Sequence, residues 1–234
     1  MEGADVRWSA NDALGIFSGT KFVNAKFTTK DDNAASATFT GDATDAEGTE
    51  AAKAFAYYPY AAGATLEGTT VSGLEIPAVQ TFAEGTFATT LNPMAAVGED
   101  HTTLAFRSVG AVLRFKLTGT DTFNKLILTG NNDESIAGAY ALDFSGEVPA
   151  MTFSGEGKSI TVTCASDVTL KTDVATEVHF VVPAGIEFTK GVSLKIVHSY
   201  YSWDAGDVNK EILTRKFTTP VSYTHLRAHE TRHD

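Results

Sequence analysis

The feature that most restricts the fold is a two-residue alternation of apolar and polar side chains, which recurs along most of the chain. In "SITVTC" (residues 159–164), Ile160, Val162 and Cys164 fall on one side, and serine and threonine fall on the other. Successive side chains of a β-strand point to opposite faces, so this pattern predicts strands with one buried and one solvated face. The same alternation runs through "AVLRFKL" (111–117), "EVHFVV" (177–182) and "VSLKIVHSY" (192–200).

Turn-forming clusters such as "TGNNDES", "SGEG" and "DAGD" separate these segments. Many short strands at regular spacing indicate a sandwich or barrel, and the crossover helices that a parallel α/β fold requires are missing. The sequence therefore predicts an all-β protein with one or two antiparallel β-sandwiches and little helix. One helical turn is expected in "NPMAAVGED" (92–100).

Two irregularities in the alternation bear on domain organisation. The apolar phase shifts at Gly110, within "FRSVGAVLRF", which predicts a bulge or a tight bend. A domain boundary is expected in "TGTDTFN" (118–124), which gives a first sandwich over residues 1–120 and a second over 121–219.

Charge excludes two classes of partner. The net charge of −11 argues against nucleic acid and against an anionic membrane surface, since both are bound through clustered Lys and Arg. The longest apolar runs fall short of the ~18 residues that a transmembrane segment needs. No signal peptide is expected in the opening residues, and the single cysteine, Cys164, allows no intrachain disulfide. On its apolar strand face, Cys164 is expected to be a small core residue rather than a nucleophile.

"HETRH" (229–233) matches the H-E-x-x-H pattern of zinc hydrolases. That chemistry requires a helix with an apolar face and a third ligand, whereas only Asp234 follows His233. The run "VSYTHLRAHET" (221–231) resembles the in-frame translation of a transposase sequencing adapter. We therefore expect the natural sequence to stop near Pro220 and residues 220–234 to be a non-native tail, which sets the zinc-hydrolase hypothesis aside.

Other signs of catalysis are weak. We expect His101 to be an exposed loop residue and His198 to be half-buried beside a local partner. Neither a G-x-S-x-G nucleophile pattern nor a Gly-rich phosphate loop occurs. The sequence predicts a protein that is not an enzyme and that holds no metal or cofactor.

Two aromatic clusters are candidate ligand-binding residues, because exposed rings can stack on sugars. The alternative is that the rings pack into the sandwich with only their hydroxyls reaching out. The clusters are "AYYPY", with Tyr57, Tyr58 and Tyr60, and "SYYSWDAGD", with Tyr200, Tyr201 and Trp203.

Several stretches, taken in order, resemble the fimbrillin family of Bacteroides-type anaerobes, which includes fimbrillin-like surface lipoproteins. Each stretch is short, and their order and spacing carry the resemblance over most of residues 6–219. They are "VRWSANDALGIF" (6–17), "AYYPY" (56–60), "IPAVQT" (76–81), "LNPMAA" (91–96), "LAFRSVGAVLRFKL" (104–117) and "HFVVPAGIEFTKGVSLKIV" (179–197).

The resemblance implies a pair of transthyretin-like sandwiches of the Greek-key type, exported to the outer-membrane surface as a lipoprotein. It implies a structural or adhesive subunit of a fimbria, major or minor, whose partners are other subunits. Assembly would proceed by strand complementation, in which a neighbour's strand fills an apolar slot. The sequence departs from the family at both ends, because only "MEGAD" precedes Val6 and adapter-like sequence replaces the last strand. The alternative function is a surface module that binds glycans or host proteins through the Tyr and Trp clusters.

Overall fold

The computed structural model describes residues 6–41, 47–219 and 221–222, and within these residues the chain forms strands and no helix. This confirms the predicted all-β class. The strands gather into two compact units, each built from three segments of the chain. Unit 1 comprises Met1–Glu75, Thr89–Gly110 and Ala139–Ser154, and unit 2 comprises Ile76–Ala88, Ala111–Gly138 and Gly155–Asp234.

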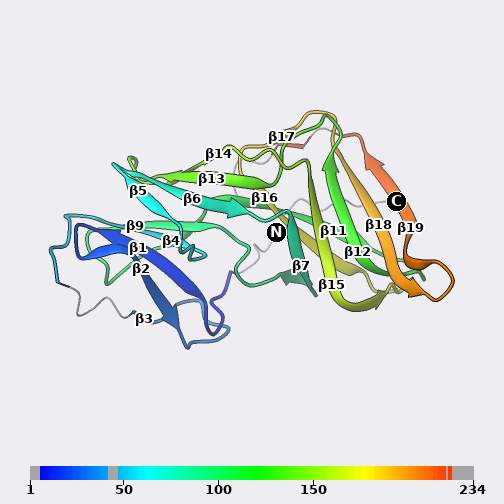
Figure 1. Ribbon diagram of the computed structural model, residues 1–234, viewed down its shortest axis with the longest axis horizontal. Helices are drawn as coiled ribbons and strands as arrows, with labels where there is room; N and C mark the ends of the chain where they lie inside the picture. Colours follow the sequence, from blue (N-terminus) through cyan, green and yellow to red (C-terminus); the bar gives the residue numbers. More distant parts are fainter. Residues whose placement is uncertain (1–5, 42–46, 220, 223–234) are drawn as a thin grey trace. The chain divides into compact units, whose positions relative to one another are not determined.

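Unit 1 contains two sheets (Figure 1). The six-stranded sheet has the order β10-β9-β4-β1-β2-β3, and the four-stranded sheet has the order β14-β13-β6-β5. The strands of the larger sheet are β1 (Ala13–Ser18), β2 (Phe22–Thr29), β3 (Phe39–Gly41), β4 (Ala54–Tyr58), β9 (Met94–Gly98) and β10 (Arg107–Ser108). Those of the smaller sheet are β5 (Thr65–Glu67), β6 (Thr70–Ile76), β13 (Gly138–Asp143) and β14 (Ala150–Phe153).

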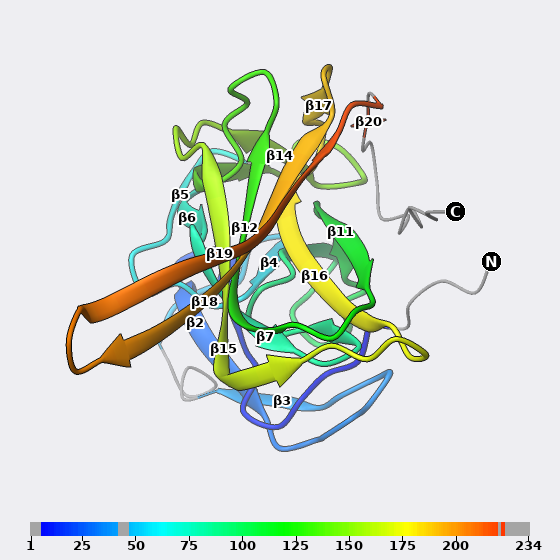
Figure 2. The same cartoon turned by 90° about the vertical axis from the view of Figure 1, so that its right-hand side faces the viewer.

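Unit 2 contains a six-stranded sheet of order β19-β18-β12-β15-β7-β8 and the pairs β11-β16 and β17-β20 (Figure 2). The larger sheet is antiparallel except that β15 and β7 run parallel. Its strands are β7 (Val79–Ala83), β8 (Thr86–Phe87), β12 (Thr122–Gly130), β15 (Ser159–Thr169), β18 (Val192–Ser202) and β19 (Gly206–Phe217). The pairs are formed by β11 (Gly110–Leu117), β16 (Thr176–Pro183), β17 (Glu187–Phe188) and β20 (Val221–Ser222).

The four segments with the clearest alternation all form strands, namely β11, β15, β16 and β18. In β15, Ile160 and Val162 are fully buried while Thr161 between them is half-buried, as the pattern predicts. The core of unit 2 is built from such positions, including Phe123 and Leu126 of β12. Burial of these apolar side chains supplies the main driving force for folding.

The helical turn expected in residues 92–100 is wrong. Met94–Gly98 form β9, which pairs with β4 from Tyr58↔Met94 to Ala54↔Gly98. The alanines in this segment favour helix locally, but pairing in the middle of a buried sheet overrides that preference.

Gly110 marks a change of sheet. The chain leaves β10 at Ser108, passes through Val109 and begins β11 at Gly110. The apolar phase therefore shifts because the two strands belong to different sheets with different buried faces.

The chain crosses between the units several times, because sheet pairing joins strands that are distant in sequence. β13 and β14, for example, extend the sheet that β5 and β6 begin. A boundary at residue 120 would divide the chain into two continuous halves, whereas each unit combines three separate segments of the chain. Within the described part of the chain, we find no helix with the length and apolar character required to span a bilayer.

Candidate functional site

The six-stranded sheet of unit 1 buries side chains on both of its faces. In β1 every residue from Leu14 to Ser18 is buried. Ile16 lies opposite Ala56 of β4, and Gly15 lies opposite Tyr57. Directly opposed residues point to the same face, so Ile16 and Ala56 share one face and Gly15 and Tyr57 share the other. This sheet therefore requires two covering layers.

The first face, which carries Gly15 and Tyr57, is covered by a regular layer. Phe55 of β4 stacks on Phe144, directly after β13, with ring centroids 4.9 Å apart. Val71 of β6 and Leu142 of β13 are fully buried. The four-stranded sheet thus closes this side of the sandwich.

The second face is covered by segments that lie largely outside regular strands, and a cavity of about 610 Å³ remains between them and the sheet. Its floor is the sheet itself, and its walls come from the N-terminal segment and from residues 35–39 and 101–106. We call this cavity the apolar groove. Its floor residues are Leu14, Ile16, Phe27 and Met94, and its aromatic wall residues are Trp8, Phe39 and Phe106.

Trp8 organises the walls of the apolar groove. Its ring meets Phe39 at 4.9 Å and Tyr58 and Phe106 at 5.3 Å, each in an edge-to-face arrangement. Its backbone forms a β-bridge with Ala34, through hydrogen bonds of 2.8 and 3.1 Å. The wall thus contains the start of a second layer, held by aromatic packing that such geometry stabilises.

A buried carboxylate supports the same wall. Asp12, which is 4 % exposed, accepts hydrogen bonds from the Tyr58 hydroxyl at 2.7 Å and from the Ser9 amide at 2.8 Å. The Tyr58 hydroxyl in turn accepts a hydrogen bond from the Thr90 amide. Burial, together with the neighbouring Asp12 carboxylate, raises the pKa of Tyr58 above its ordinary value. The phenol therefore stays protonated and continues to donate.

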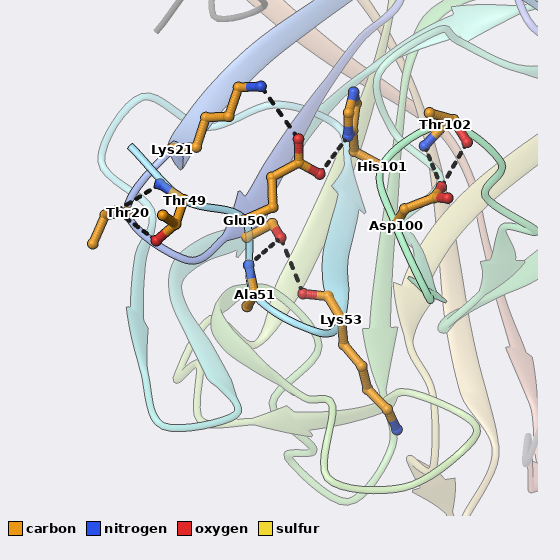
Figure 3. A network of polar contacts seen from close by, with 10 residues as sticks. Thr20, Lys21, Thr49, Glu50, Ala51, Lys53, Asp100, His101 and Thr102 are labelled. Atoms are coloured by element: carbon orange, nitrogen blue, oxygen red, sulfur yellow. Dashed lines mark hydrogen bonds and ion pairs between the residues drawn. The ribbon is translucent and has the colours of Figure 1, made fainter. Parts of the chain in front are cut away.

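A polar network joins Lys21, Glu50 and His101 (Figure 3), and of these His101 lines the groove. The Glu50 carboxylate accepts a hydrogen bond from His101 Nδ1 at 2.8 Å and forms an ion pair with Lys21 Nζ at 3.3 Å. The hydrogen bond from His101 is the main cause that lowers the pKa of Glu50 below its ordinary value. The His101 ring also packs on Phe22, at 4.6 Å between centroids. His101 is thus tied to the sheet and lines the groove, rather than standing free in a loop as expected.

Neighbouring contacts fix the segment that carries His101. The Asp100 carboxylate accepts hydrogen bonds from the Thr102 amide at 2.8 Å and from its hydroxyl at 2.6 Å (Figure 3). Residues 101–106 are thereby anchored at their start, although residues 103–106 lie in no strand. A wall of this kind can shift to admit a ligand more easily than a strand within a sheet ladder can.

The lining of the groove determines what it can bind. Aliphatic side chains and aromatic rings form its floor, and its walls combine apolar side chains with the polar groups of Ser36, Thr38, His101 and Thr102. Such a lining suits a segment that presents both apolar and polar groups, since a buried polar group needs a hydrogen-bond partner.

The structure places the two aromatic clusters predicted from sequence in different environments. Tyr57 and Tyr58 lie in the core, at 0 % and 4 % exposure, so burial removes them from the rings that a ligand can reach. Burial also raises the pKa of Tyr57 to about 12. Tyr60 is half-buried, with Lys26 Nζ 5.3 Å from its ring centre. The rings of the second cluster are exposed, and Tyr201 meets Trp203 edge to face with centroids 5.7 Å apart; these rings are Tyr200, Tyr201 and Trp203.

Sequence reasoning did not find the apolar groove. Its floor residues look like ordinary core positions, and its aromatic wall residues come from segments without alternation. The available signal was "ALGIF", where apolar residues are consecutive and so must bury both faces of one strand. That signal predicts that a second layer covers this sheet. It does not predict that the layer consists of irregular segments around a cavity.

Another candidate residue from the sequence, His198, has a local partner in the structure. His198 is half-buried and its Nε2 donates to the Asp167 carboxylate at 3.1 Å, which confirms the expected local partner. Across the described ranges there is no cluster of His, Cys, Asp or Glu side chains that could hold a metal ion. "HETRH" (229–233) lies outside the described residues.

Cys164 is half-buried in β15, and desolvation, with a contribution from the Asp167 charge, raises its pKa to about 11. The thiolate is the reactive form, so we expect Ellman's reagent to modify Cys164 about a hundredfold more slowly at pH 8 in the folded chain than in the chain unfolded by guanidinium. The unfolded chain presents the same thiol and serves as the control. Equal rates in the two states would show that the thiol is not shielded.

We compared the chain with protein-family models, curated proteins and solved structures, and none of them matches it. What the structure defines is an all-β protein in which one apolar sheet face is covered by irregular segments around a cavity instead of by a second sheet.

Proposed function

We propose that this protein is a structural or adhesive subunit of a cell-surface fimbria, and that its apolar groove accepts a β-strand from a neighbouring subunit. One observation carries the proposal: the sheet of unit 1 is apolar on both faces, and a cavity of about 610 Å³ remains on the face that lacks a sheet. The fimbrillin-like order of sequence motifs supports it, and Val6 and Trp8 of the first motif line the groove.

The physics of the proposed step is strand addition. An extended segment presents alternate side chains to one face, and each would fill part of the cavity above Leu14, Ile16 and Met94. Removing apolar surface from water contributes about 25 cal/mol per Å². The backbone of the incoming strand would pair with the irregular walls and extend the layer that the Trp8–Ala34 bridge begins.

The remaining parts of the proposal follow from the resemblance. The two units would each be a transthyretin-like sandwich, and the mature subunit would be a lipoprotein at the outer-membrane surface. Its partners would be other subunits of the same fimbria. No catalytic step is part of this function.

Trp8 provides a direct test, because the chain contains two tryptophans and Trp203 can be replaced. In a Trp203→Phe background, titration with a short peptide that alternates valine and threonine between terminal lysines should shift Trp8 emission saturably to the blue. Ala37→Phe places a ring at a position that lines the groove and should weaken this binding about tenfold or more.

Ala62→Phe is the matched control, since Ala62 is exposed in the same unit and does not line the groove. It should bind the peptide as the background protein does. A peptide that leaves Trp8 emission unchanged, or that binds equally to the Ala37→Phe variant, would contradict strand uptake at this groove.

A further inference from the structure

The β18–β19 hairpin extends beyond the neighbouring strands of unit 2 and carries two large exposed rings at its turn (Figure 2). The ladder between β12 and β18 ends at Val197, whereas β18 and β19 stay paired as far as Ser202↔Gly206. Trp203 in the turn is 93 % exposed, and Tyr201 is 64 % exposed. These rings add little to the core of unit 2, and adjacent exposed apolar side chains of this size are typical of interaction surfaces.

The two rings form one preorganised unit. The Tyr201 and Trp203 rings meet edge to face with centroids 5.7 Å apart, so both project from the same side of the hairpin. This arrangement stabilises an aromatic pair. Gly206 closes the turn with φ of +69°, which glycine adopts without steric cost. Rings that are already held together lose little conformational entropy when a partner buries them, so the end of the hairpin can serve as an aromatic anchor.

We propose that the end of this hairpin, with Tyr201 and Trp203, inserts into the apolar groove of a second copy of the chain. The inference rests on the proposed function, because it names the segment that occupies the groove. The cavity of about 610 Å³ has the size of pockets that enclose small molecules, ~300–1,000 Å³, and can take up two aromatic side chains. Its floor of Leu14, Ile16 and Met94 offers the rings an apolar environment that the hairpin alone does not provide.

The polar groups of the groove match those of the hairpin end. A buried tyrosine hydroxyl or indole N–H requires a hydrogen-bond partner. The hydroxyls of Ser36 and Thr38 line the groove and can accept a hydrogen bond from the Trp203 indole N–H. The Tyr201 hydroxyl can donate to the same kind of group or accept from it. A groove with this composition suits amphipathic rings better than a purely aliphatic segment.

A second copy is the occupant because one chain carries both parts of the contact. The groove belongs to unit 1 and the hairpin to unit 2. When two identical chains meet through different surfaces, one groove and one hairpin end stay free, so further copies can add in the same way. Head-to-tail contact of this kind is what a subunit of a filament requires.

Area and charge determine the strength of the contact. Tyrosine and tryptophan bury about 150–250 Å² each, so the hairpin end and the groove together bury less than the ~1,200 Å² at which stable interfaces begin. We therefore expect a weak contact that forms at high protein concentration. The net charge of −11 on each copy opposes association, and Asp204 and Asp207 lie in the hairpin end. Added salt should strengthen the contact, because it screens this repulsion.

Sedimentation velocity of the full chain should show an average mass that rises with protein concentration up to about 1 mM. Trp203→Ala and Ala37→Phe should each weaken this association about tenfold or more, because the first removes the anchor and the second narrows the groove. An equimolar mixture of the two variants should recover association and stop at pairs. In that mixture, one variant supplies the intact groove and the other supplies the intact hairpin.

Val174→Ala is the matched control, because Val174 is an exposed apolar residue of unit 2 outside the hairpin end. It should associate as the unaltered protein does. Circular dichroism checks that each variant is folded. Thr38→Arg, at an exposed position of the groove wall, replaces Ala37→Phe if the phenylalanine prevents folding.

A mass that does not change with concentration, association that survives Trp203→Ala, or a mixture that stays monomeric would overturn the inference. Uptake of the alternating peptide without self-association would remove the hairpin as the occupant and leave the proposed function standing. Recovery in the mixture without peptide uptake would uphold the hairpin contact and count against uptake of an extended strand. The two proposals can therefore fail separately.

Discussion

Replacing Gly15 by alanine should destabilise the protein by about 3 kcal/mol, which is near the upper end of the cost of overpacking a core. Gly15 lies opposite Tyr57 in the sheet, and a methyl carbon at this position would be 2.6 Å from the Tyr57 hydroxyl oxygen. Tyr57 is fully buried, and its hydroxyl donates to Asn24 Oδ1 at 2.6 Å or to the Ala61 carbonyl at 2.9 Å. The ring therefore has no free path by which to move aside.

The measurement is urea unfolding followed by circular dichroism, with Gly63→Ala as the matched control. Gly63 has no atoms near the position of a new methyl group, so its replacement should change stability by less than about 0.5 kcal/mol. Adding Tyr57→Leu to Gly15→Ala should give a smaller loss than the sum of the two single changes, because both act on one contact. A Gly15→Ala protein as stable as the Gly63→Ala protein would contradict the predicted overlap.

Gln80→Leu should cost about 3 kcal/mol, because it leaves two buried backbone groups without partners. Gln80, on β7, is 1 % exposed. Its Nε2 donates to the Val181 carbonyl at 2.7 Å, and its Oε1 accepts from the Val181 amide at 2.9 Å. The side-chain amide thus pairs with β16 as a neighbouring strand would. Leucine has nearly the same volume and removes this pairing, together with a longer hydrogen bond of 3.4 Å from Nε2 to the Pro77 carbonyl.

Urea unfolding and amide hydrogen exchange at Val181 measure the effect together. We expect exchange at Val181 to accelerate in the Gln80→Leu protein, since its amide loses its acceptor. Thr81→Leu is the control on the same strand, because Thr81 is exposed and its replacement leaves the pairing intact. Unchanged protection at Val181 would show that another group satisfies this amide.

The structure gives physical reasons for several residues of two sequence stretches near the start of unit 1. In "VRWSANDALGIF" and "AYYPY", Trp8 packs on Tyr58, Asp12 accepts from the Tyr58 hydroxyl, and Gly15 makes room for Tyr57. Two segments far apart in sequence thus meet on both faces of one sheet. Trp8, Asp12 and Tyr58 lie on the face of the apolar groove, whereas Gly15 and Tyr57 lie on the opposite face.

The sequence by itself determined the class of fold and the four most regular strands. Alternation with a period of two follows from strand geometry alone, so β11, β15, β16 and β18 could be located from residue order. The half-burial of His198 followed in the same way from its place at a strand end. Local patterns of this kind need no knowledge of what each strand faces.

Only the tertiary structure decided which rings are accessible and where the second layer is incomplete. "AYYPY" and "SYYSWDAGD" are both rich in tyrosine. Tyr57 is nevertheless buried beneath a second sheet, whereas Trp203 is exposed at a hairpin turn. Burial is a property of the partners that a strand finds, and those partners lie tens of residues away in the chain. The apolar groove could not be predicted for the same reason. Its floor and walls come from segments that are distant in sequence, and no local pattern shows that these segments come into contact.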